Sequence, residues 1–251
     1  MNWLLLNSGK CEPALNMALD EALLETMSHL QRPVLRFYGW TEPAATFGYF
    51  QKYAEVERAT SLRPLIRRPT GGGIVPHAAD WTYSFAVPPG HEWHSLKAEA
   101  SYRRIHEWIR SAFTKSGIRT ELAPSCQRST LDTRPSSPPG ACFVGYVKSD
   151  LLWHGKKIAG AAQRRNKLGL LIQGSVQPPL FQKAERGRQK AEAENRKSDW
   201  TRTDWENAMC KVAQQEFGIE WSKLVMGEEL SERARTLARE KYSQDRFNQK
   251  R

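Results

Sequence analysis

The chain has 251 residues, a hydrophobic content of 39% and a net charge of +11, from 38 Lys and Arg against 27 Asp and Glu. These values fit one ordinary folded domain, alone or with a helical appendage, and we expect a folded rather than a disordered chain. No run approaches the roughly 20 apolar residues that span a bilayer, and the first residues lack a basic leader, so we expect a cytoplasmic protein without a membrane partner.

The first half of the chain predicts one long helix followed by short strands. Apolar side chains recur at helical spacing over residues 13–30, and the polar, proline-containing segment 31–33 ends that pattern. The next runs are rich in β-branched and aromatic residues, and a turn joins the first two of them. The elements expected after the long helix are strands over 34–40 and 45–50, a short helix over 54–59, and strands over 65–68, 74–75 and 81–87.

The second half begins with an amphipathic helix over residues 96–116, and Gly117 is placed to end it in the left-handed conformation. Residues 124–140 are rich in Pro, Ser, Thr and Arg and lack periodicity, which predicts a mobile surface loop. The remaining elements expected are strands over 150–153, 157–163 and 168–176, and helices over 184–197, 205–217 and 228–242.

This order of elements predicts an α+β fold in which a mixed β-sheet is packed with helices. We divide the chain into a main domain over residues 1–177, which carries the motifs below, and a charged helical C-terminal extension over 178–251. The first part has 22 basic and 14 acidic residues and the second has 16 and 13, so the positive charge is concentrated on the first. Such a surface suits either nucleic-acid phosphates or an acidic protein partner.

Three consecutive glycines, Gly71, Gly72 and Gly73, follow a strand that ends with Arg67 and Arg68. Glycines let the backbone approach a ligand closely, and the adjacent arginines favour an anionic or strongly polarised ligand. A tight turn between two strands explains the same glycines without any ligand. No Gly-Lys-Ser/Thr sequence follows, so the segment is not a nucleotide-binding P-loop.

A second motif combines a lysine with small residues in the segment 155–163. Lys157 stands at the start of a strand, and Gly160 and Ala161 leave space beside it. A partly desolvated lysine can stabilise the oxyanion that forms on an acyl carbonyl, or it can lower the pKa of a nearby thiol. A basic hairpin turn is the alternative interpretation.

The four cysteines, Cys11, Cys126, Cys142 and Cys210, form no CxxC pair and no zinc-ligand spacing, so neither a metal site nor a disulfide framework is expected. Cys142 follows the expected loop and precedes Phe143, a place where a thiol can be exposed and reactive. The alternative is a buried thiol that takes no part in chemistry.

Taken in chain order, these segments resemble the lipoate-protein ligase and octanoyltransferase family, whose relatives include biotin protein ligase. The resemblance covers residues 13–177 and implies a biotin/lipoate protein ligase-like catalytic domain over 1–177. The Cys142-Phe143 pair resembles that of the cysteine-dependent protein octanoyltransferases, the subgroup to which the sequence is most similar. The matching segments are 16–22, 67–77, 80–84, 155–163 and 170–176.

This resemblance implies a nucleophile at Cys142 and a catalytic lysine at Lys157. The implied reaction moves an octanoyl group from acylated acyl carrier protein, through a cysteine thioester, to a lysine of a lipoyl domain or of the glycine-cleavage carrier protein. It uses no metal ion or other cofactor, and its acidic protein partners suit the basic surface better than nucleic acid does. The acyl-binding and substrate-binding residues implied are Arg68, Gly71, Gly72, Gly73, His77, Gly160 and Ala161.

Two alternative functions remain. An ATP-dependent lipoate-protein ligase would form lipoyl-adenylate with Lys157, ATP and Mg²⁺, and Gly73 is closer to the ligases than to the subgroup, in which arginine is common. Ser149 and Asp150 also depart from the tyrosine and glutamate that the subgroup often has. The spacing from His77 to Tyr83 is shorter than in ligases that have an extra Gly-Asn in that loop, which favours the transferase. A catalytically inactive basic binding module is the other alternative, although no nucleic-acid-binding motif is present.

Overall fold

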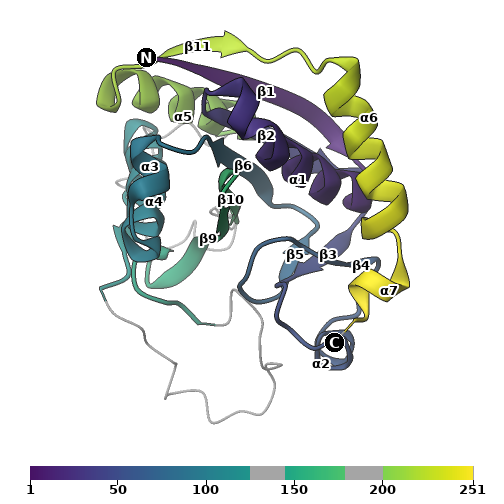
Figure 1. Ribbon diagram of the computed structural model, residues 1–251. Helices are drawn as coiled ribbons and strands as arrows, with labels where there is room; N and C mark the ends of the chain where they lie inside the picture. Colours follow the sequence, from purple (N-terminus) through teal and green to yellow (C-terminus); the bar gives the residue numbers. More distant parts are fainter. Residues whose placement is uncertain (125–144, 179–199, 251) are drawn as a thin grey trace.

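The computed structural model describes residues 1–124, 145–178 and 200–250 (Figure 1). Nearly all of the loop expected over 124–140, the Cys142-Phe143 pair and the helix expected over 184–197 therefore lie outside the described residues. Within the described ranges, no helix is long and apolar enough to cross a membrane.

The part of the chain that the structure describes forms two sheets, one of eight strands in the order β11-β1-β2-β6-β10-β9-β8-β7 and one of three in the order β4-β3-β5. In the main sheet β1 runs parallel to β2 and β11, and the other neighbours are antiparallel. The strands are β1 (Asn2–Cys11), β2 (Val34–Trp40), β3 (Ala44–Phe47), β4 (Leu65–Arg67), β5 (Val75–His77), β6 (Trp81–Val87), β7 (Glu121–Leu122), β8 (Leu151–Trp153), β9 (Lys156–Asn166), β10 (Gly169–Val176) and β11 (Glu220–Lys223).

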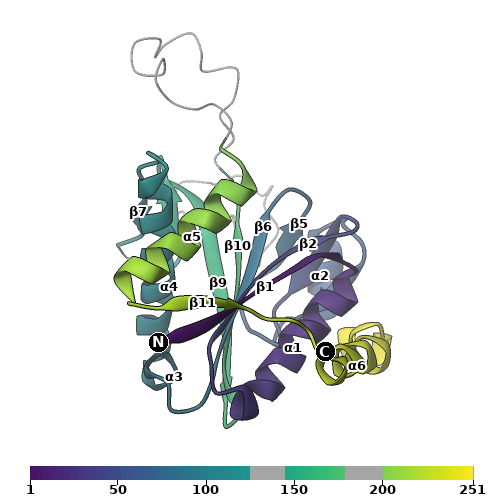
Figure 2. The same ribbon diagram turned by 90° about the horizontal axis from the view of Figure 1, so that it is seen from above.

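Helices cover both faces of the main sheet, as Figure 2 shows. On one face lie α4 (Ala98–Lys115) and α5 (Arg202–Glu216), and on the other lies α1 (Pro13–Leu30), against which α6 (Glu228–Leu237) packs. The chain continues from α6 through a π-helical turn, η2 (Ala238–Tyr242), to α7 (Asp245–Asn248), which contacts β4. The shorter helices are α2 (Tyr53–Ala59) and α3 (Glu92–Ser95).

The alternation of side chains along β6 separates an aromatic core from a polar region. Trp81, Tyr83 and Phe85 belong to the apolar core that α4 and α5 cover, where burial of each large side chain stabilises the fold by about 1.5–3 kcal/mol. Thr82 and Ser84 point to the opposite face, where Ser84 bonds to a residue of α1. The main sheet therefore presents polar side chains on the face that carries the candidate site.

The predicted fold class is confirmed, as are the helices expected over 13–30 and 96–116 and the strands expected over 34–40, 81–87 and 168–176. Several findings differ from the sequence predictions, and two of them concern the sheets. β2 and β3 are consecutive but belong to different sheets, so they do not pair with each other. The strands β1 and β11 were not expected, because main-chain pairing between the two ends of the chain holds them together and local periodicity does not report such pairing.

Candidate active site

A cavity of about 40 Å³ lies between the main sheet and the three-stranded sheet. Strands β2, β6, β9 and β10 form one wall, and α1, β3, β5 and the segment that includes Gly72 form the rest. This volume holds a few water molecules, so a larger ligand requires the surrounding side chains to move. The lining residues are Met17, Tyr38, Thr46, Arg68, Gly72, Val75, His77, Thr82, Gly160, Ala161, Ala162, Gln173, Gly174 and Ser175.

Small residues on two paired strands create the space. Gly160 on β9 faces Ser175 on β10, and Ala161 faces Gly174. A side chain at position 174 would collide with the ring of Tyr83 in the apolar core on the opposite face of the sheet, so packing of that core requires glycine at this point of β10. The two small residues that the sequence placed beside the lysine, Gly160 and Ala161, therefore lie at the cavity.

Among the three consecutive glycines, Gly72 is the one that lines the cavity. Its φ of +88° lies in the left-handed region, and a Cβ atom there would stand 2.9 Å from Nη2 of Arg68. A Cβ atom on Gly48 would collide with the carbonyl oxygen of Gly72, so the backbones of the two segments are in direct contact. Gly71 and Gly73 are not lining residues, and their carbonyl oxygens each accept a hydrogen bond from Nη2 of Arg68 at 2.7 Å.

The two adjacent arginines have different environments. Arg68 lines the cavity, and its guanidinium donates to Oγ1 of Thr46 at 3.3 Å as well as to the two glycine carbonyls. Arg68 therefore holds the glycine segment, residues 71–73, through hydrogen bonds from the cavity side. Arg67 is fully buried and is not a lining residue, because its guanidinium bonds to main-chain carbonyl groups that include that of Asn248. The inference that flanking arginines favour an anionic ligand does not extend to Arg67.

His77 is held in place by three neighbours at the cavity wall. Its Nδ1 lies 2.9 Å from Oδ2 of Asp80, its Nε2 lies 2.8 Å from Oγ1 of Thr46, and its ring stacks on Trp40 with 3.8 Å between centroids. Burial by itself would raise the pKa of Asp80, but the charge of His77 and hydrogen bonds from His77 and nearby hydroxyl groups lower it. An ionised Asp80 thus orients the imidazole.

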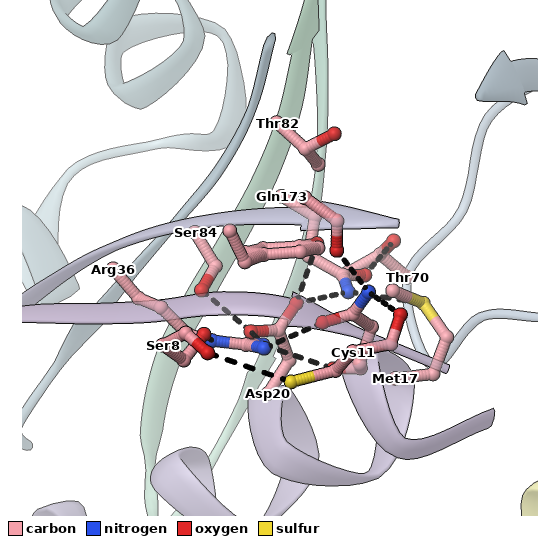
Figure 3. Close-up of polar contacts among 12 residues, drawn as sticks. Ser8, Cys11, Met17, Asp20, Arg36, Thr70, Thr82, Ser84 and Gln173 are labelled. Carbon is pink, nitrogen blue, oxygen red and sulfur yellow. Dashed lines mark hydrogen bonds and ion pairs between the residues drawn. The ribbon is translucent and has the colours of Figure 1, made fainter. Parts of the chain in front are cut away.

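A buried ion pair beneath the cavity was not predicted from the sequence. Asp20 on α1 and Arg36 on β2 lie 2.6 Å apart, and neither side chain is exposed. Ser84 donates to the same oxygen of Asp20 at 2.6 Å (Figure 3), and Arg36 also donates to Oδ1 of Asn16 at 2.7 Å. A buried ion pair is tolerated only when such additional hydrogen bonds satisfy both partners. No local sequence signal marks the pair, because the helix that carries Asp20 also carries Glu21 and Glu25.

This network reaches the cavity through Tyr38 and Gln173, which both line it. Each donates to Oδ2 of Asp20, Tyr38 at 3.0 Å and Gln173 at 2.7 Å. Oε1 of Gln173 accepts a hydrogen bond from Thr70 at 2.7 Å, and Figure 3 shows Gln173 between Asp20 and Thr70. Burial, reinforced by the charge of Asp20, raises the pKa of Tyr38 well above its usual value, so its hydroxyl is a neutral donor. The glycine segment, which follows Thr70, is thereby tied to the floor of the cavity.

Lys157 lies in a buried ion pair on the strand that carries Gly160. Its Nζ is 2.8 Å from Oδ2 of Asp150, and the two side chains are only 7% and 4% exposed. The same carboxylate oxygen accepts a hydrogen bond from the backbone N–H of Val147 at 2.8 Å. Lys157 is not a lining residue of the cavity, but it stands three positions before Gly160, which is one. Its ammonium group is therefore fixed near one end of the row of small residues.

His106 on α4 is buried close to this ion pair. The residue is only 1% exposed, so its imidazole is shielded from water. Burial lowers the pKa of His106 to about 4, an effect that the charge of Asp150 opposes and the charge of Lys157 reinforces. The imidazole is therefore neutral at physiological pH.

Acidification is expected to destabilise the fold through His106. The unfolded imidazole takes up a proton near pH 6.5 and the folded one only near pH 4, so the unfolded state binds more protons between these values and stability falls as the pH falls. The expected loss is about 2 kcal/mol between pH 7.5 and pH 5. Urea unfolding of the parent and of His106→Phe at both pH values measures it. The variant should lose less stability, whereas His29→Gln, which changes an exposed histidine, should behave as the parent does.

The described residues include two of the four cysteines, and both are partly buried free thiols. Burial, followed by the charge of Glu206, raises the pKa of the Cys210 thiol to about 12, so this thiol stays protonated and is a poor nucleophile. Cys126 and Cys142 lie outside the described residues. No group of three or more His, Cys, Asp or Glu in the described part of the chain could hold a metal ion.

Known proteins are similar to this chain in both sequence and fold. Residues 12–183 match the lipoyl protein ligase A/B catalytic domain. The chain is 39% identical over 184 residues to the octanoyltransferase LipM of Geobacillus kaustophilus and 34% identical over 179 residues to that of Bacillus subtilis, and each alignment covers 69% of this chain and 64% of the relative. The chain thus spans less than two thirds of the length of these curated relatives. Its fold resembles that of a bi-partite lipoate protein ligase from Thermoplasma acidophilum, with a TM-score of 0.71 at 20% identity over 99% of this chain and 96% of the other.

Proposed function

Because the chain belongs to the lipoyl protein ligase A/B catalytic domain family, we propose that it is a protein octanoyltransferase of lipoate biosynthesis. The relatives named octanoyltransferase support this activity. The structural observation that carries the proposal is the buried ion pair of Lys157 with Asp150, on the same strand as the small residues of the cavity. In this proposal residues 1–177 carry the catalytic groups.

The first step is attack of the Cys142 thiolate on the thioester carbonyl of octanoyl acyl carrier protein. A new C–S bond forms, and the tetrahedral intermediate collapses by breaking the bond to the carrier, whose thiolate leaves and takes up a proton. The product is an octanoyl thioester on Cys142. The role of Cys142 rests on its position in the sequence, after the expected loop and before Phe143.

In the second step the neutral amine of an acceptor lysine attacks this thioester. The amide C–N bond forms, the C–S bond breaks, the nitrogen loses a proton and the Cys142 thiol is regenerated. Both steps develop negative charge on the acyl oxygen, and the ammonium group of Lys157 stabilises it by a charge-assisted hydrogen bond. The ion pair with Asp150 supports this role because it holds the ammonium group in a fixed, nearly water-free position.

The cavity is the proposed acyl-binding site. Gly160 gives room for the chain, Ala161 lines the same wall, and Gly72 allows the backbone of the glycine segment to lie against it. Arg68 supports this wall by holding the carbonyl groups of the segment, and His77 lines the same site. Because the cavity has a volume of only about 40 Å³, acyl binding requires these walls to separate.

The partners proposed are acylated acyl carrier protein as the donor and a lipoyl domain or the glycine-cleavage carrier protein as the acceptor. All are acidic proteins in the related systems that the sequence resembles. The excess of basic residues over 1–177, 22 against 14 acidic ones, supports this choice because opposite charge accelerates association.

The deciding experiment is incubation of the protein with octanoyl acyl carrier protein without ATP, followed by intact mass measurement. We expect an octanoyl adduct that hydroxylamine removes and that disappears when an acceptor domain is added. Acceptor modification only in the presence of ATP and free octanoate or lipoate would instead identify a ligase. No modification under either condition, together with binding of the carrier, would identify an inactive binding module.

A further inference from the structure

The side chain of Arg67 connects two segments that are distant in the sequence. Its Nη1 donates to the carbonyl oxygens of Tyr49 and Gln51, at 2.8 and 2.7 Å. Its Nη2 and Nε donate to the carbonyl oxygen of Asn248, at 2.8 and 3.2 Å. One buried guanidinium therefore joins the loop after β3 to the C-terminal turn, residues 238–248, which contains η2 and α7.

Asn248 completes this junction with its own side chain. Its Oδ1 accepts a hydrogen bond from the backbone N–H of Arg67 at 2.9 Å, and its Nδ2 donates to the carbonyl oxygen of Tyr242 at 2.9 Å. The residue is buried, whereas the next residue, Gln249, is exposed. An asparagine is needed here because the contact uses an acceptor and a donor on one short side chain.

The C-terminal turn is also attached to α1, on the other side of the cavity. Nζ of Lys241 and the hydroxyl of Tyr242 each lie 2.8 Å from a carboxylate oxygen of Glu21. The helix that carries Glu21 also carries Met17, which lines the cavity. Residues 228–248 therefore extend from α1 to the three-stranded sheet, as the course of α6 and α7 in Figure 1 shows.

The loop that Arg67 holds lies directly against the glycine segment. The backbone N–H of Tyr49 donates to the carbonyl oxygen of Thr70 at 2.9 Å. Gly48 contacts Gly72 so closely that there is no room for a methyl group between them. A displacement of residues 48–51 is therefore transmitted to Gly72, which lines the cavity.

We propose that Asn248 is a positioning residue which, acting through Arg67, holds the glycine segment in the conformation that binds the acyl chain. The kinetic part of this inference rests on the proposed transferase function. Its structural part, the coupling of position 248 to residues 48–51 and to the glycine segment, does not depend on the reaction. The C-terminal turn is in this view a part of the substrate site.

The kinetic test compares Asn248→Ala with Gln249→Ala in the full-length chain. The first removes both side-chain hydrogen bonds, and the second changes an exposed neighbour that makes neither. For Asn248→Ala we expect KM for octanoyl acyl carrier protein to rise roughly 10-fold while kcat changes less than about 2-fold, since the loss affects binding and not the reacting groups. Gln249→Ala should match the parent. A roughly 10-fold fall in kcat with KM unchanged would contradict the proposal.

Amide hydrogen exchange without substrate separates this proposal from the proposed function. In Asn248→Ala the amides of Tyr49 and Arg68 should exchange about 10-fold faster than in the parent, while those of β9 and β10 stay unchanged. If Asn248→Ala shows this faster exchange but the parent transfers no octanoyl group, the coupling is upheld and the transferase function is rejected. Unchanged exchange at Tyr49 and Arg68, or equal acceleration throughout β9 and β10, would overturn the coupling.

Asn248→Ser serves if the alanine variant does not unfold in a single cooperative transition. Serine keeps an acceptor that can reach the backbone N–H of Arg67 but loses the bond to Tyr242. We expect exchange at Tyr49 that is faster than in the parent. Exchange equal to that of the parent would count against the proposal.

Discussion

Replacement of Cys142 by serine is expected to abolish the acyl-enzyme and to slow octanoyl transfer by about 10³-fold or more. A hydroxyl group is almost entirely protonated at neutral pH, whereas a thiol has an accessible thiolate that attacks thioesters readily. The intact mass of the variant after incubation with octanoyl acyl carrier protein should equal that of the untreated protein. The rate of acceptor acylation gives the second measurement.

Cys126→Ser is the matched control, because Cys126 lies in the predicted loop that Cys142 follows and has no proposed role. It should form the octanoyl adduct and transfer it at the parental rate. A Cys142→Ser variant that still accumulates a hydroxylamine-sensitive adduct as fast as the parent would assign the nucleophile to another residue. Parental transfer without any adduct would favour direct attack of the acceptor lysine on the carrier thioester.

Replacement of Lys157 by methionine is expected to reduce the rate of transfer by about 10²–10³-fold, the usual effect of removing one donor to a developing oxyanion. Methionine keeps much of the volume and loses the charge. The change also leaves the Asp150 carboxylate, which is 4% exposed, without its partner, and an unpaired buried charge costs about 3–5 kcal/mol of stability. Transfer kinetics and urea unfolding measure the two effects separately.

The double variant Asp150→Asn/Lys157→Met distinguishes catalysis from stability. It removes both charges, so most of the lost stability should return while the rate of transfer stays low. Lys156→Met changes the adjacent, exposed lysine and should leave rate and stability unchanged. If the double variant recovered the parental rate, Lys157 would be a structural residue and the proposed oxyanion contact would be wrong.

Most elements around the site were predictable because each is a property of a short stretch of chain. The apolar stripe over residues 13–30 folds as α1, and the small residues after Lys157 lie on β9 with Gly160 and Ala161 at the cavity. The family was also predictable, since several motifs in the right order are far more specific than one. The proposed nucleophile at Cys142 remains a prediction from the sequence.

The buried contacts of the site were not predictable in the same way. Asp20 and Arg36 are separated by a helix and a turn, and each looks like an ordinary surface residue until α1 packs on β2. His106 reads as one polar position on an amphipathic helix, yet it is buried beside Asp150 and Lys157. Such contacts join elements that are far apart in the chain, and local patterns carry no record of which elements become neighbours.

The sequence by itself determined the fold class, the family and the groups available for chemistry, because periodicity, small residues and motif order are local properties. Only the tertiary structure decided what each group faces. Arg67 and Arg68 are adjacent and chemically alike, yet successive residues of an extended chain point in opposite directions. Arg68 therefore meets the glycine segment at the cavity, whereas Arg67 meets the C-terminal turn, which arrives from the far end of the chain.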